Sequence, residues 1–312
     1  MKKILVLLLL WGPCYSYAQS TAEAKKLYQA NKLEEAKEVL LALDDSDKDV
    51  PYFLGRIAFD QREFKKSVSY FEDLSDDYPN VADYHYWYGN ALGRQAQESS
   101  VFRQGLLAPK IKNAYEKAVA LDPKNIDAHL SLIEFYTLAP GIMGGSWEKA
   151  EETAEVIKSI DPAQGHTAMA TVWIRQEEYD KAEKEYQQAM QLNSQYAFTL
   201  GYFYQGRKSF DKAFDLFQKV YAEDTTKIGA LYQIGRTSAF SGTNSELGIA
   251  SLENYLSKEL PPNFPSPSAA WMRMAMIYEK KGDDQKAVEL YTKSLALDEN
   301  MEESKKGLER LR

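Results

Sequence analysis

The stretch HTAMATVWIRQEEYDKAEKEYQQAMQLNS, residues 166–194, contains two amphipathic segments joined by a short polar turn. In its second half, small and aromatic residues recur at the period of one helical face: Tyr179, Ala182, Tyr186 and Ala189. In its first half, another helical face carries Met169, Ala170 and Trp173. Because only a few polar residues separate the two faces, the stretch predicts a helical hairpin.

The same pattern recurs elsewhere in the chain. Residues 52–79 read YFLGRIAFDQREFKKSVSYFEDLSDDYP, residues 197–224 read AFTLGYFYQGRKSFDKAFDLFQKVYAED, and residues 269–300 read AAWMRMAMIYEKKGDDQKAVELYTKSLALDEN. Aromatic residues at matching positions would fill the space between hairpins. Small residues such as Ala213 and Ala287 would let the two helices of a hairpin approach closely. We therefore expect a repeat of about 34 residues.

At these positions the chain resembles the tetratricopeptide repeat (TPR) family, whose pattern runs Trp-x2-Leu-Gly-x2-Tyr, then Gly, a small residue, an aromatic, a small residue and Pro. The resemblance implies an all-α fold, a right-handed superhelical solenoid of about eight hairpins over residues 19–312. Its first helices are expected to begin near residues 20, 49, 82, 126, 163, 194, 228 and 268. A last helix, residues 301–311, would cap the exposed apolar face of the final repeat.

The first 18 residues have the features of a secretory signal peptide. Lys2 and Lys3 precede an apolar run over residues 4–11, and small residues suit cleavage after Ala18. The run is too short to cross a bilayer as a helix, so we expect no membrane insertion of the mature chain. The single cysteine, Cys14, lies within this segment. These features predict an exported protein, periplasmic or extracellular, that is stable without disulfides.

The charge of the chain limits its partners. The formal net charge is −8, and it becomes −10 when residues 1–18 and their two lysines are removed. Proteins that bind nucleic acid need clustered Lys and Arg, so an acidic chain argues against a nucleic-acid partner. It also argues against anionic membrane surfaces.

Two neighbouring repeats carry extra residues between their helices. In the fourth repeat, Tyr136 and Ala150 are 14 positions apart where an ordinary repeat has nine. In the third repeat, residues 98–109 (ESSVFRQGLLAP) add ten positions to the same kind of turn. We expect both insertions to be loops that leave from the same edge of the solenoid.

The insertion in the fourth repeat lies in the glycine-rich stretch TLAPGIMGGSWEKAEE, residues 137–152. Its glycines do not have the spacing of a phosphate-binding or dinucleotide-binding loop, and no strand precedes them. Ser146 is expected to cap the following helix, and Glu148 and Glu151 in its first turn would repel a phosphate. The stretch therefore predicts a detour between two helices rather than an anion site.

Both insertions contain apolar residues that are unusual in loops: Phe102, Leu106, Leu107, Ile142 and Met143. Two interpretations remain open. These side chains could fold back and cover the ends of the hairpins, or they could form a platform that binds a partner.

The three histidines, His85, His129 and His166, all occupy the Trp position of consecutive repeats. Equivalent positions in stacked hairpins are about 10 Å apart, the distance between packed helices. Ligands of one metal ion lie much closer together. We therefore expect no metal site and no cofactor. Because the mature chain has no thiol and no supported Ser-His-Asp pattern, it is predicted not to be an enzyme.

In TPR proteins the inner wall of the solenoid is built from the first helices. Carried onto this chain, the resemblance implies a partner-binding groove lined by Tyr52, Arg56, Phe59, Tyr86, Asn90, Arg94, Arg175, Phe198, Tyr202, Tyr232, Arg236 and Phe240. Aromatic residues and arginines are enriched at binding hot spots. The family's carboxylate clamp for chaperone C-termini needs Lys and Asn at set positions, and only Asn90 matches it. Packing of these aromatics on neighbouring helices is the alternative.

Together these features predict a non-catalytic scaffold of the bacterial envelope that binds a peptide or protein partner in its concave groove. The alternative is a small-molecule or lipid-binding component of an envelope transport system. The sequence does not name the partner.

Overall fold

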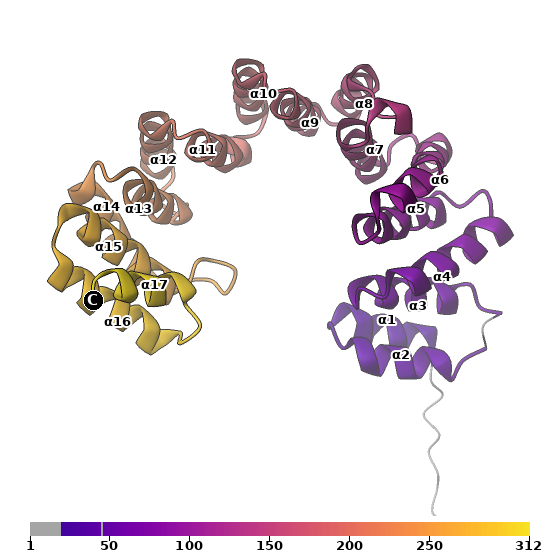
Figure 1. The fold of residues 1–312 in the computed structure, drawn as a ribbon, viewed down its shortest axis with the longest axis horizontal. Coiled ribbons are helices and arrows are strands. Elements are labelled where there is room, and N and C mark those ends of the chain that lie inside the picture. Colours follow the sequence, from indigo (N-terminus) through magenta and orange to yellow (C-terminus); the bar gives the residue numbers. More distant parts are fainter. Residues whose placement is uncertain (1–19, 45) are drawn as a thin grey trace, which may run out of the picture. The chain divides into compact units, whose positions relative to one another are not determined.

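A computed structural model describes residues 20–44 and 46–312, so the predicted signal peptide and Cys14 lie outside the described residues. The described residues form 17 α-helices and two short 3-10 helices, without a strand (Figure 1). The chain divides into two units, one ending at Ile157 and one beginning at Lys158. Each is a succession of helix pairs, and the fold is a helical solenoid.

Unit 1 contains the first eight α-helices. They are α1 (Thr21–Gln29), α2 (Leu33–Leu41), α3 (Asp49–Asp60), α4 (Phe64–Asp77), α5 (Ala82–Gln97), α6 (Val101–Leu121), α7 (Ile126–Leu138) and α8 (Trp147–Ile160), with the 3-10 turn η1 (Gly141–Met143) before α8. The helices α1 and α2, α3 and α4, and α5 and α6 pack as pairs, and each pair contacts the next. The boundary between the units falls within α8.

Unit 2 contains the remaining nine α-helices. They are α9 (Pro162–Arg175), α10 (Tyr179–Leu192), α11 (Ala197–Gly206), α12 (Phe210–Glu223), α13 (Gly229–Ser241), α14 (Ser245–Leu256), α15 (Pro267–Lys281), α16 (Asp284–Leu297) and α17 (Glu302–Arg310), with the 3-10 turn η2 (Ser194–Tyr196) before α11. Pairs again form between consecutive helices, and α17 packs against α16 and α15.

A close contact between a glycine and an aromatic ring recurs inside the pairs. A Cβ at Gly201 of α11 would lie 2.2 Å from Cζ of Phe217 of α12, and one at Gly55 of α3 would lie 2.9 Å from Phe71 of α4. Both rings are fully buried. Because the ring occupies the place of a side chain, the two helices can approach closely only where the first carries glycine.

The third repeat shows the same contact with a longer spacing. A Cβ at Gly89 of α5 would lie 2.6 Å from Cε1 of Tyr115 of α6. The ring follows the glycine by 16 positions in the pairs above, and by 26 positions here. The ten inserted residues are therefore accommodated without any change in how the two helices meet.

The prediction that residues 98–109 form a loop is wrong. Helix α5 ends at Gln97, and α6 begins at Val101 and continues through Pro109 for 21 residues. Proline removes the backbone hydrogen bond to the residue four positions earlier and crowds that residue's carbonyl, yet α6 continues through it. The first turn of the helix forms upstream, with Gln104 N donating to Ser100 O at 2.9 Å. The insertion therefore lengthens α6 at its amino end.

Two glycines of the second insertion are required by the backbone. Gly144 has φ of +100°, in the left-handed region. A Cβ at Gly145 would lie 1.8 Å from the carbonyl oxygen of Ala139, so no other residue fits there. Ser146 N then donates to Tyr136 O at 3.0 Å, and Ser146 Oγ accepts from Lys149 N at 3.2 Å. The prediction of Ser146 as a helix cap is confirmed.

Three buried serines link the last three helices of unit 2, α15, α16 and α17. Ser268 of α15 and Ser294 of α16 exchange hydrogen bonds with each other's carbonyl oxygens at 2.8 and 3.0 Å. Ser304 of α17 donates to Ser294 Oγ at 2.9 Å. Their hydroxyls are satisfied in an apolar surrounding, which fixes α17 against the last pair.

Candidate partner-binding surface

Unit 1 contains a cavity of about 280 Å³ where the wall of first helices meets both insertions. Its apolar lining comes mainly from α6, α7 and η1. These residues are Ala108, Ile111, Phe135, Leu138, Pro140 and Met143. Three predicted wall residues, Phe59, Asn90 and Arg94, also line it. The structure therefore brings part of the predicted groove and part of the predicted platform together.

One side of this cavity is held by a polar contact. Tyr115 Oη donates to Asn90 Oδ1 at 2.8 Å. Burial raises the pKa of Tyr115 well above its ordinary value, so the hydroxyl stays a neutral donor. One turn further along α5, Gly93 lines the cavity, and a Cβ there would lie 3.7 Å from Tyr115 Oη. The cavity is open at Gly93 because that residue has no side chain.

The rim of the cavity carries both signs of charge. Arg94 is exposed, and its Nη1 donates to Gln97 Oε1 at 2.9 Å. Glu134 of α7 lines the cavity as well. The Cζ of Arg94 also lies 5.8 Å from the centroid of the Phe64 ring. Arg94 thus contacts a neutral amide and an aromatic ring. An apolar interior with polar groups at its rim suits an amphipathic ligand.

The insertion residues divide into two groups. Phe102, Leu106 and Ile142 are 79%, 62% and 96% exposed. Leu107 and Met143 are partly buried, and a Cβ at Gly105 of α6 would lie 3.3 Å from Met143 Cε. The two insertions therefore touch each other, as their neighbouring positions predict. The side chains of the first group form an apolar surface that is exposed on unit 1.

The side chain of Arg56, a predicted wall residue, packs against other residues of unit 1. Its Cζ lies 3.7 Å from the centroid of the Trp87 ring, and its Nη1 donates to Tyr52 Oη at 3.0 Å. Burial, together with a hydrogen bond to Asp83, raises the pKa of Tyr52 to about 12. Tyr86 packs edge-on against Trp87, with ring centroids 5.5 Å apart. These residues are half-buried, so packing accounts for much of their surface.

In unit 2 three predicted wall residues, Tyr202, Arg236 and Phe240, line a second cavity of about 290 Å³. Phe198 packs against Phe217 with ring centroids 5.9 Å apart. Arg175 is exposed at the last residue of α9. These five residues keep accessible surface.

The assignment of Tyr232 to the groove wall is corrected by the structure. Its side chain is only 6% exposed, and its ring packs against Tyr255 of α14 with centroids 5.5 Å apart. The ring fills the inside of its own helix pair and offers little surface to a partner.

The wall of unit 2 has a member that the sequence did not indicate. Arg273 of α15 lies over the ring of Phe240, with its Cζ 4.8 Å from the centroid. Arg236 lies over the same ring at 5.1 Å. The list of wall positions taken from the sequence ended at α13, so Arg273 was missed.

The histidines have structural partners. Nε2 of His85 and Nε2 of His129 each donate to the carbonyl oxygen of a proline six residues earlier, Pro79 and Pro123, at 3.0 Å. His166 Nδ1 lies 2.6 Å from Glu185 Oε2. Within the described part of the chain, no group of His, Cys, Asp and Glu is arranged to hold a metal ion. No helix in that part is long and apolar enough to cross a membrane.

Comparisons with known proteins address the repeats directly. Residues 52–97 and residues 268–301 match models of the tetratricopeptide repeat. No curated protein sequence matches the chain. A solved TPR protein of Thermus thermophilus is 15% identical over 59% of this chain and 96% of its own, with a TM-score of 0.48.

Two further solved structures are similar. A tetratricopeptide repeat protein from Parabacteroides merdae is 14% identical over 85% of this chain and 98% of its own, with a TM-score of 0.49. YrrB, described as a TPR protein with an unusual peptide-binding site, is 16% identical over 64% of this chain and 99% of its own, with a TM-score of 0.41. The two segments that match the repeat models are tetratricopeptide repeats, and the successive helix pairs of both units fit a solenoid built from such repeats.

Proposed function

We propose that this protein is a non-catalytic scaffold of the bacterial envelope that binds a peptide or protein partner on unit 1. The observation that carries the proposal is the cavity at Gly93, which joins three wall residues to the two insertions. The exposed side chains of Phe102, Leu106 and Ile142 extend the apolar surface beside it. Apolar anchors seated in a pocket and ringed by polar groups are typical of binding hot spots.

The size of the cavity favours a side chain of a partner over a free small molecule. Small-molecule sites usually enclose about 300–1,000 Å³. The unit 1 cavity, at about 280 Å³, is just below that range. One large apolar residue of a partner would fill it, while the neighbouring residues of that partner contact Arg94 and Glu134 at the rim.

Site-specific photo-crosslinking in cells tests this proposal. A photoreactive amino acid placed at Phe102 or Ile142 is expected to trap the same partner. The same group at Leu41, which is 64% exposed at the end of α2, is the matched control and is expected not to trap it. Crosslinks that appear equally at all three positions, or that persist when Gly93→Leu fills the cavity, would show that unit 1 has no specific site.

The envelope location rests on the first 18 residues and is tested separately. We expect the full chain, expressed in a bacterium, to be recovered outside the cytoplasm with residues 1–18 removed. Full-length protein confined to the cytoplasm would contradict this part of the proposal and leave the binding site unaffected.

A further inference from the structure

Unit 2 contains two arginines that lie next to each other without a counter-charge. Arg236 of α13 and Arg273 of α15 are both placed over the ring of Phe240, at 5.1 and 4.8 Å from its centroid. A cation over an aromatic face is attracted to the ring, and one ring here attracts two guanidinium groups.

The polar contacts of these guanidinium groups are neutral. Arg236 Nη1 donates to Gln205 Oε1 at 3.1 Å and lies 3.4 Å from Gln233 Oε1. Arg273 Nη1 lies 3.3 Å from the sulfur of Met276, and its buried Nε has no hydrogen-bond partner. Among the described residues neither arginine forms an ion pair with a carboxylate, although the chain has 46 acidic residues.

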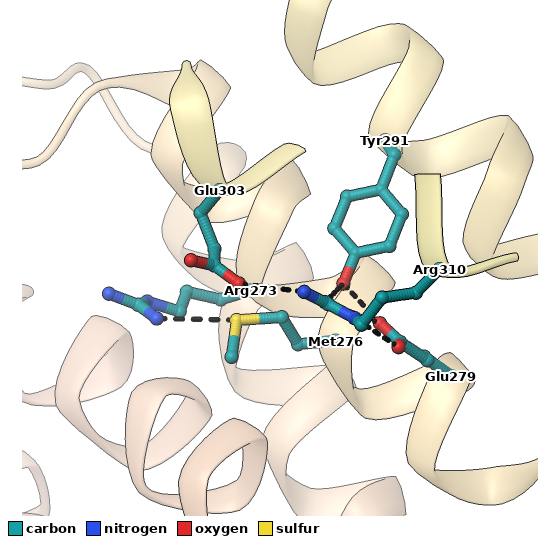
Figure 2. A network of polar contacts seen from close by, with 6 residues as sticks. All are labelled: Arg273, Met276, Glu279, Tyr291, Glu303 and Arg310. Carbon is teal, nitrogen blue, oxygen red and sulfur yellow. Dashed lines mark hydrogen bonds and ion pairs between the residues drawn. The ribbon is translucent and has the colours of Figure 1, made fainter. Parts of the chain in front are cut away.

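The carboxylate of Glu279, six residues after Arg273 in α15, is already bound by another arginine. Glu279 is bound by Arg310 through two hydrogen bonds, at 2.9 and 3.0 Å. In Figure 2 the guanidinium of Arg273 contacts Met276 and points away from that pair. Burial, and then the charge of Arg273, lowers the pKa of Arg236, as expected for neighbouring cations that are not neutralised.

The equivalent positions in unit 1 hold an arginine and an aromatic residue instead of two arginines. Arg56 and Arg236 each directly follow the glycine of their first helix, Gly55 and Gly235. In unit 1 the partner of Arg56 on the next first helix is Trp87, at 3.7 Å. By the repeat register, the residue of α15 that corresponds to Trp87 is Arg273. A favourable stack in unit 1 is thus a like-charge pair in unit 2, which is unfavourable unless an anion joins it.

Beside Arg236 there is space for such an anion, and Arg273 borders this space at the ring of Phe240. The second cavity, of about 290 Å³, is lined by Arg236, Gln205 and Gly206 together with the rings of Tyr202 and Phe240. The two rings supply apolar contact, and the amide of Gln205 fixes the orientation of Arg236. A ligand bound here would need a negative group for the arginines and an apolar part for the rings.

We infer that Arg236 and Arg273 form a subsite for a carboxylate carried by an apolar segment of the peptide partner. Arginine binds the planar carboxylate through paired N–H donors, and two arginines can each supply such a fork. The carboxylate could belong to an Asp or Glu side chain or to a chain end. This inference rests on the proposed function only in taking the ligand to be a peptide.

Small probes test the subsite independently of unit 1. Acetyl-phenylalanine carries a terminal carboxylate, acetyl-glutamyl-phenylalaninamide carries a side-chain carboxylate, and acetyl-phenylalaninamide carries none. Binding to the full chain is followed by NMR at the arginine Nε–H groups. We expect saturable shifts with at least one of the two acids, which identifies the source, and at least tenfold weaker binding of the amide.

Variants connect this binding to the two arginines. Arg236→Gln and Arg273→Gln are each expected to weaken binding of the acidic probe at least tenfold. Lys293→Gln removes the same charge from α16, outside the cavity, and is expected to leave binding within twofold. Arg273→Lys keeps the charge without the fork and is expected to give an intermediate affinity.

Thermal unfolding separates a binding role from a structural role. Because each Arg→Gln change relieves repulsion, we expect the unfolding temperature to stay the same or rise. A lower unfolding temperature with unchanged probe affinity would overturn the inference, as would equal affinity for the amide or for sulfate. Failure of the unit 1 crosslinks would contradict the proposed function without affecting this result.

Discussion

The ring of Phe217 in α12 occupies the space that a side chain at Gly201 of α11 would need. A Cβ at Gly201 would lie 2.2 Å from Cζ of the fully buried phenylalanine. The contact sets how closely the two helices pack, and the same arrangement returns at Gly55 and Phe71. The repeat is therefore maintained by a size relationship between two positions 16 residues apart.

The change Gly201→Ala is expected to destabilise the protein by about 1–3 kcal/mol, because the added methyl group forces the ring or the helix to move. The free energy of unfolding in urea measures this effect. Gly206→Ala in the same helix is the matched control. Apart from the backbone of its own helix, no atom of the described residues lies within 4 Å of a Cβ there, so alanine should leave stability unchanged or raise it by up to ~1 kcal/mol. Equal effects of the two changes would contradict the close-packing account.

The exposed apolar residues of the insertions should matter for binding and not for folding. Phe102→Ser and Leu106→Ser remove side chains that are 79% and 62% exposed, so each should change stability by less than about 0.5 kcal/mol. Crosslinking of the unit 1 partner from Ile142 should fall markedly in the double variant. A large loss of stability would instead show that these residues cover the hairpin ends.

The last helix should be held in a pH-dependent way by Glu279. Hydrogen bonds from Arg310 lower the pKa of Glu279, and a bond from Tyr291 lowers it further. A lowered folded pKa gives stability that is present above the unfolded value, about 4.3, and is lost as the pH falls through the folded value.

Glu279→Gln is therefore expected to cost about 1 kcal/mol at pH 7, less than is usual for charged hydrogen bonds because Arg310 is 46% exposed. The difference from the wild type should shrink between pH 5 and pH 3, as followed by urea unfolding. Glu302→Gln, in an exposed pair with Lys305, serves as the control and should leave stability unchanged. A deficit that is independent of pH would contradict the role of the carboxylate.

The helix pairs could be predicted from the sequence because one physical pattern repeats. Small residues such as Ala182 and aromatic residues such as Phe217 return at the helical period, and both are fully buried in the structure. Local rules also identified Ser146 as a helix cap. Such features depend on neighbouring residues, so the sequence contains them.

The insertion in the third repeat could not be predicted in the same way. Gly105 and Pro109 both favour a break, yet α6 runs through them because tertiary contacts override local preference. Tyr232 was misplaced for a related reason, since only the structure shows its ring turned toward Tyr255. Arg273 could have been found from the repeat register, by asking which residue stands in the place of Trp87.

The central claim is that the cavity at Gly93 anchors the partner of unit 1. The most direct test is to measure the affinity of the crosslinked partner for two variants at this position. Gly93→Leu places a side chain in the cavity, and Gly93→Ala adds one methyl group, 3.7 Å from Tyr115 Oη. We predict that the leucine variant binds at least tenfold more weakly, that the alanine variant binds within about twofold of the wild type, and that both unfold at the wild-type temperature. Binding of the leucine variant with wild-type affinity would contradict the claim.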